Sequence, residues 1–170
     1  MAKENRNFRE MNLAIFRGDD PGGVLWQPRL EFWYAVNKKR DTLPEHLRGA
    51  DLLEIYDYCH ASVRYFGNGL RVRRRKVKVT SEWVGGKRLR HTWETPIGTL
   101  TEVIHFDAWG LSGYHTEAKL KGPEDFRVLE YILQDEEWYW DQEAYEGDLE
   151  RVGERGAPQF FFRRSPIQGL

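Results

Sequence analysis

The segment 71–106 constrains the fold most strongly, because its apolar and polar side chains alternate. Val77 and Val79 are interleaved with lysines, and the pattern is interrupted twice, at Gly85-Gly86 and at 95–98, each interruption carrying glycine. Period-two alternation separated by glycine-bearing turns is typical of consecutive antiparallel strands. We therefore expect an antiparallel hairpin or three-stranded meander over about 71–106.

Outside this segment, amphipathic helices alternate with short apolar runs. Apolar spacing of three and four predicts helices at 5–17, 50–59, about 124–134 and from about 141 to Gly153 or Gly156, with a short helix or irregular segment at 30–39. The apolar runs predict strands at 24–26, 62–66 and 157–162.

Short, fully apolar strands that alternate with helices are typical of a parallel sheet covered by helices. A complete (β/α)8 barrel takes about 250 residues, and this chain has 170. We expect a single α/β domain over 1–170 that forms the N-terminal portion of a (β/α)8 TIM barrel, with the meander of 71–106 inserted. The alternative is a small α+β domain that shares the pattern.

Composition narrows the class of protein. The chain is 40% apolar and 31% charged, and it has no run near the 18 apolar residues of a spanning helix. Its N-terminus also lacks the apolar centre of a signal peptide. A single cysteine, Cys59, excludes an internal disulfide and is typical of a reducing compartment. We therefore expect a cytoplasmic protein without a membrane partner.

The histidines do not predict a metal site. They are spread along the chain without H-E-x-x-H or another ligand spacing, at His46, His60, His91, His105 and His115. We therefore expect no metal or other cofactor in this chain alone.

The basic run of 71–78, with Arg73, Arg74 and Arg75 consecutive, is the best candidate for a nucleic-acid patch. Lysine- and arginine-rich strands are also the ordinary way to solvate a sheet edge. Because the whole chain has a net charge of −1, we favour the solvated edge and expect no nucleic-acid partner.

The stretch 24–34, VLWQPRLEFWY, places Arg29 just past an expected strand. Arg29 could pair with Glu31, lie on the surface along its methylene stem, or face a ligand. The C-terminal end of a barrel strand points at the active site, which favours a ligand-facing position. Arg64 lies within the expected strand 62–66, and Arg163 and Arg164 follow the expected strand at 157–162. Arg29 with Arg64 or Arg164 could hold an anion; alternatively these arginines lie on the surface or contact a missing second half.

Six short segments, in order and over nearly the whole chain, resemble the N-terminal half of the uroporphyrinogen decarboxylase superfamily. They are 12–18 leading to 24–29, then Glu94–Leu100, Lys121–Phe126, and Val152–Gly156 before Ser165-Pro166. The likeness is closer to the decarboxylase-like and methyltransferase-like members than to the enzyme of the haem pathway. The resemblance implies a (β/α)8 barrel and either decarboxylation of tetrapyrrole acetate groups without a cofactor, or methyl transfer to and from corrinoids or thiols with zinc.

The resemblance also implies roles for particular residues. Arg29 falls on the arginine that holds substrate carboxylates at the end of the family's first strand. Where the family has an aspartate after its second strand, this chain has Asn68 between two glycines, which could supply an acceptor oxygen or simply form a turn. The family's later catalytic residues and metal ligands would lie beyond Leu170.

Two functions follow. The chain is a fragment or split half of an enzyme that binds an anionic substrate, with zinc or a corrinoid possible only with a missing C-terminal half. Alternatively it is a non-catalytic remnant of the same fold that forms oligomers or binds a second chain through an open sheet edge and its aromatic surface.

Overall fold

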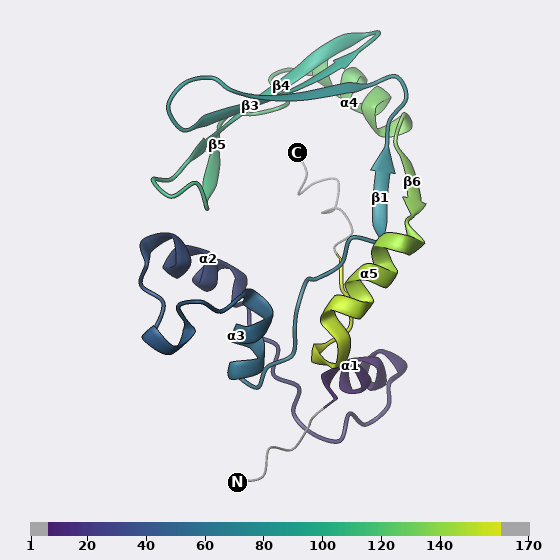
Figure 1. Ribbon diagram of the computed structural model, residues 1–170. Coiled ribbons are helices and arrows are strands. Elements are labelled where there is room, and N and C mark those ends of the chain that lie inside the picture. Colours follow the sequence, from purple (N-terminus) through teal and green to yellow (C-terminus); the bar gives the residue numbers. More distant parts are fainter. Residues whose placement is uncertain (1–6, 161–170) are drawn as a thin grey trace. The chain divides into compact units, whose positions relative to one another are not determined.

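A computed structural model describes residues 7–160 (Figure 1). The chain divides into two compact units. The first contains the described residues up to Leu70 and those from Trp140 onward, and the second contains Arg71–Tyr139.

The first unit is helical. Its elements are α1 (Phe8–Arg17), α2 (Glu31–Arg40), the 3-10 helix η1 (Glu45–Leu47), α3 (Leu52–Tyr58), α5 (Gln142–Val152) and the 3-10 helix η2 (Gly153–Arg155). Its core brings segments far apart in sequence together, and consists of Leu53, Tyr56, Ala61, Val63 and Val152.

The ends of these helices follow local chemistry. Gly18 caps α1 in the left-handed conformation, with φ 80°, which glycine adopts without a Cβ penalty. At α3, the Asp51 side chain accepts a hydrogen bond from the Glu54 amide, and the Glu54 side chain accepts one from the Asp51 amide. This capping box satisfies two backbone donors that a helix start leaves open.

The second unit is built on an antiparallel sheet in the order β2-β3-β4-β5. The strands are β2 (Lys78–Trp83), β3 (Arg88–Thr95), β4 (Gly98–Phe106) and β5 (Gly113–Glu117). The antiparallel meander expected within 71–106 is therefore confirmed, and it continues into β5 through a pairing with an irregularity at Val103/Ile104.

Helix α4 (Asp125–Gln134) packs against β3 and β4. The core of this unit contains Val77, Leu100, Val128 and Ile132. A Cβ on Gly98 would lie 2.9 Å from Val128 Cγ2, which is closer than carbon atoms normally approach. Glycine at the turn between β3 and β4 therefore allows α4 to approach the sheet closely.

A second, two-stranded sheet pairs β1 (Leu70–Arg73) with β6 (Glu137–Trp140). No strand is expected from the sequence at 135–140, between two expected helices. The acidic and aromatic composition of 135–140 does not by itself predict a strand. The strand that pairs with it lies more than 60 residues earlier in the chain, so no local pattern indicates the pairing.

The expected barrel portion is wrong. Residues 24–26, 62–66 and 157–160 form no strand, and the strands that do form belong to two antiparallel sheets of two and four strands. Isolated backbone hydrogen bonds join the apolar segments, from Ser62 N to Trp26 O (2.9 Å) and from Val63 N to Arg155 O (2.8 Å), without extending into a ladder. Val63 packs into the core of the helical unit, whereas Val24 and Trp26 are 82% and 53% exposed. Periodicity does not distinguish either arrangement from parallel pairing.

Candidate functional site

Arg29 and Arg64 converge on the ring of Tyr65 in the first unit. The guanidinium carbon of Arg64 lies 4.1 Å from the ring centroid and that of Arg29 lies 5.8 Å from it. Both distances are within the range of a cation–π contact. The Tyr65 hydroxyl also accepts a hydrogen bond from Nη2 of Arg64.

No carboxylate within residues 7–160 forms an ion pair with either arginine. Arg29 is exposed and Arg64 is half-buried. Since both guanidinium carbons lie near one centroid, at 5.8 and 4.1 Å, they are within about 10 Å of each other. That upper limit is about one Debye length at 0.1 M salt, so part of the repulsion between the two cations survives screening. Of the alternatives for Arg29, pairing with Glu31 is not formed, since Glu31 contacts Tyr56 instead.

Tyr56 fixes the segment that carries Arg29. Its side chain is fully buried, and its hydroxyl donates to Pro28 O at 2.9 Å and lies 3.1 Å from Glu31 Oε1. Burial, followed by the negative charge of Glu31, raises the pKa of Tyr56 to about 12, so the hydroxyl keeps its proton. The backbone on either side of Arg29 is thus attached to α3.

A network of buried amide groups fixes the segment that carries Arg64. Gln27 Nε2 donates to Val63 O at 2.9 Å, and Asn12 Nδ2 donates to Ser62 Oγ at 2.9 Å. Gln27 also reaches the Asn12 side-chain oxygen at 3.2 Å. Because buried polar groups are costly unless paired, this network holds the residues before Arg29 and those before Arg64 side by side.

Tyr65 has a backbone φ of 54°. A bulky residue in the left-handed region is uncommon and costs free energy. From the sequence, Tyr65 was expected in a strand and its side chain was given no role. The only sequence signal for it is its position beside Arg64.

Asn68 is not part of this cluster. Its backbone amide donates to Oδ2 of Asp148, and its Nδ2 donates to Asp148 Oδ1 at 3.2 Å. Asp148 is a buried carboxylate on α5, and these bonds satisfy it. These contacts of Asn68 are structural, and a ligand-binding role for its side chain stays a prediction. Arg163 and Arg164 lie outside the described residues.

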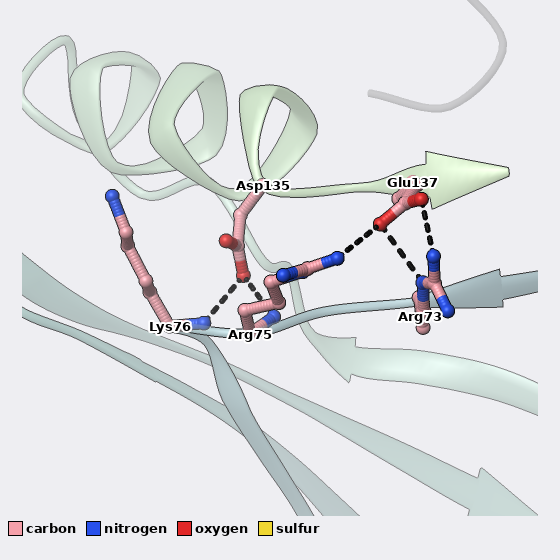
Figure 2. A network of polar contacts seen from close by, with 5 residues as sticks. All are labelled: Arg73, Arg75, Lys76, Asp135 and Glu137. Carbon is pink, nitrogen blue, oxygen red and sulfur yellow. Dashed lines mark hydrogen bonds and ion pairs between the residues drawn. The ribbon is translucent and has the colours of Figure 1, made fainter.

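The basic run of the second unit meets an acidic run. Arg73 and Arg75 both pair with Glu137, and the Asp135 carboxylate accepts three consecutive backbone N–H groups, those of residues 75–77, at 2.9 to 3.0 Å. Figure 2 shows Arg73 on β1 and Arg75, just after that strand, facing Glu137 on β6, while Asp135 at the end of α4 lies beside the backbone that follows β1. Arg74 forms an ion pair with Glu136, whose side chain is only 3% exposed.

These contacts lower the pKa of the acids. Hydrogen bonds from Arg73 and Arg75 lower the pKa of Glu137 to about 2. The backbone amide of Lys76, with those of Val77 and Arg75, lowers the pKa of Asp135. Arg73, Arg74 and Arg75 are therefore paired with acids of their own unit. The expectation of a solvated edge without a nucleic-acid partner stays a prediction.

Within residues 7–160, no three His, Cys, Asp or Glu side chains are grouped so that they could hold a metal ion. His91 Nδ1 lies 2.7 Å from Ser81 Oγ, and His115 lies 3.6 Å from Glu102. Each of these pairs joins neighbouring strands of the meander.

No protein-family model, no curated protein and no solved structure matches the chain. In the described part of the chain, no helix has the length and apolar character needed to cross a membrane.

Proposed function

We propose that this chain binds a small molecule carrying carboxylate groups through Arg29 and Arg64. The observation that carries the proposal is the convergence of two arginines on one ring while no carboxylate of residues 7–160 pairs with either. A bound carboxylate relieves the repulsion between the two cations, and the planar guanidinium pairs with it through two parallel hydrogen bonds.

The resemblance to the uroporphyrinogen decarboxylase superfamily supports a choice of substrate class. On that basis the ligand is a tetrapyrrole or related polycarboxylate, and the reaction is decarboxylation or a corrinoid- or thiol-dependent methyl transfer. Zinc or a corrinoid, and the groups that carry out the chemistry, would come from a second chain that joins this one.

Titration with an octacarboxylate porphyrin, followed by its absorbance, tests this proposal. We expect Arg29→Ala and Arg64→Ala each to weaken binding about ten-fold, or about 1.4 kcal/mol, the scale of one charge-assisted hydrogen bond. Arg48→Ala is the matched control, because Arg48 is an exposed arginine of the same unit. Its affinity should equal that of the wild type.

Thermal unfolding of each variant excludes a loss of fold as the cause. Arg29 is exposed, and exposed substitutions change stability by about 0.5 kcal/mol or less. Equal porphyrin affinity for the wild type and all three variants would falsify the proposed site. A cationic porphyrin of the same size should not compete with the octacarboxylate for binding.

Self-association or binding of another protein is a second candidate function. It is favoured by large apolar side chains that the first unit exposes, among them Phe16 at 71% and Phe32 at 57%. Light scattering during size-exclusion chromatography should then show an oligomer that Phe16→Ser with Phe32→Ser dissociates. A monomeric wild type at all concentrations would remove this candidate.

We place the protein in the cytoplasm, a proposal supported by a sequence with a single cysteine. Fractionation of cells expressing the chain, with a cytosolic and a membrane marker, tests it. Recovery with the membrane marker would contradict it.

A further inference from the structure

Tyr65 bends the chain at the candidate site. In an extended segment the side chains of Arg64 and Tyr65 would point to opposite sides. Tyr65 instead adopts the left-handed conformation, with φ 54°. Its ring lies 4.1 Å from the Arg64 guanidinium carbon. Asp41, another positive-φ residue, serves as the left-handed cap of α2; Tyr65 stands at no helix end.

The same ring reaches both cations. Its face lies near Arg29 as well as Arg64, and its hydroxyl accepts a hydrogen bond from Arg64. The aromatic face attracts each guanidinium through the ring quadrupole, which partly offsets the repulsion between them. Residues held in a strained backbone conformation are found at functional sites. Tyr65 is such a residue, and two like charges lie near its ring.

We propose that Tyr65 is a positioning residue that holds Arg64 and Arg29 side by side, so that the site selects ligands with two carboxylates over ligands with one. Each guanidinium takes one carboxylate in a bidentate pair. This inference rests on the proposed function, because it assigns the ligand class of the same two arginines.

Two probes test the selectivity: a porphyrin with two carboxylates, and the same porphyrin with one of them esterified. The wild type should bind the dicarboxylate about ten-fold more tightly. In Arg64→Ala this preference should disappear, because one guanidinium remains. Equal affinity of the wild type for both probes overturns the selectivity.

Substitutions of Tyr65 test its positioning role. Tyr65→Phe keeps the ring and removes the hydroxyl, so dicarboxylate affinity should fall about three-fold, as expected for one hydrogen bond. Because the hydroxyl acts through Arg64, adding Tyr65→Phe to Arg64→Ala should cause no further loss. Adding it to Arg29→Ala should cause the full three-fold loss.

Tyr65→Asn separates positioning from a structural role. Asparagine adopts the left-handed conformation more readily than tyrosine, so the variant should unfold at the same or a higher temperature while it binds the dicarboxylate about ten-fold more weakly. A matching drop in unfolding temperature and affinity would give Tyr65 a structural role and overturn the inference.

The outcomes also distinguish the two proposals. If Arg29→Ala and Arg64→Ala weaken binding but every Tyr65 variant binds like the wild type, the Tyr65 inference fails and the proposed function stands. If neither arginine variant changes affinity, both fail.

Discussion

The two units use arginine in opposite ways. In the second unit, Arg73, Arg74 and Arg75 meet the carboxylates that follow α4 and are neutralised. In the first unit, Arg29 and Arg64 meet the ring of Tyr65 instead. The difference shows that the density of basic residues along the sequence is a poor guide to which arginines stay without an acidic partner. The densest run is paired with acids, whereas Arg29 and Arg64 form no ion pair with a carboxylate of residues 7–160.

The largest expected effect in this comparison is at the buried ion pair. Arg74→Ala would leave Glu136, whose side chain is 3% exposed, without its guanidinium partner. Removing one partner of a buried pair costs about 3 kcal/mol, because the remaining charge stays desolvated. Urea unfolding of Arg74→Ala and of the matched control Arg48→Ala checks this. Arg29→Ala in the same assay should behave like the control.

The double variant Arg74→Met with Glu136→Leu should recover most of that stability, since apolar side chains of similar size replace the pair without leaving a charge. A double variant as unstable as Arg74→Ala would show that Glu136 contributes through contacts other than its pairing with Arg74.

An intermediate effect is expected on acidification. The pKa values of Glu137 (about 2) and Asp135 are lowered in the folded state. Their stabilisation is therefore fully present above their unfolded values of about 4.3 and 3.9. It is lost as the pH falls through those values toward 2. Urea midpoints measured between pH 6 and pH 2.5 should decline less steeply in Glu137→Gln than in the wild type.

Because Glu137 is 46% exposed, salt screens this contribution. At 1 M salt the wild type and Glu137→Gln should approach each other. Parallel pH curves for the two proteins at low salt would mean that the arginine–glutamate contacts do not persist in solution.

The smallest effect is expected at Arg75, whose side chain is 72% exposed. Exposed ion pairs contribute little because water and side-chain entropy offset them. Arg75→Ala should change the unfolding temperature by less than about 2 °C and leave porphyrin binding unchanged. A loss of porphyrin affinity in Arg75→Ala would move the anion site to the second unit and break the comparison.

Sequence patterns predicted the elements that depend on neighbours in the chain. The meander follows from alternation and from glycine at its turns, and the helices around 8–17, 52–58 and 125–134 follow from apolar spacing and their caps. The prediction of a barrel portion was wrong. A short apolar run at 24–26 or 62–66 has the same sequence pattern whether or not it pairs in a sheet.

The candidate site was predictable in part. Arg29 and Arg64 were expected near an anion, and the structure brings them together on Tyr65. Asn68 was given either an acceptor role or a role in a turn, and its side chain bonds a buried aspartate. Tyr65 was missed because its role depends on one positive φ, and a non-glycine residue gives no sequence signal for that conformation.

The sequence by itself determined where helices begin and end and where the meander turns, because capping, glycine conformation and apolar periodicity act over a few residues. Only the tertiary structure decided which arginines are paired. The contact of Arg73 with Glu137 spans 64 positions in the chain, and the meeting of Arg29 with Arg64 depends on buried amides from separate segments. Such contacts form when folding closes long loops, and the residue types alone allow many other pairings.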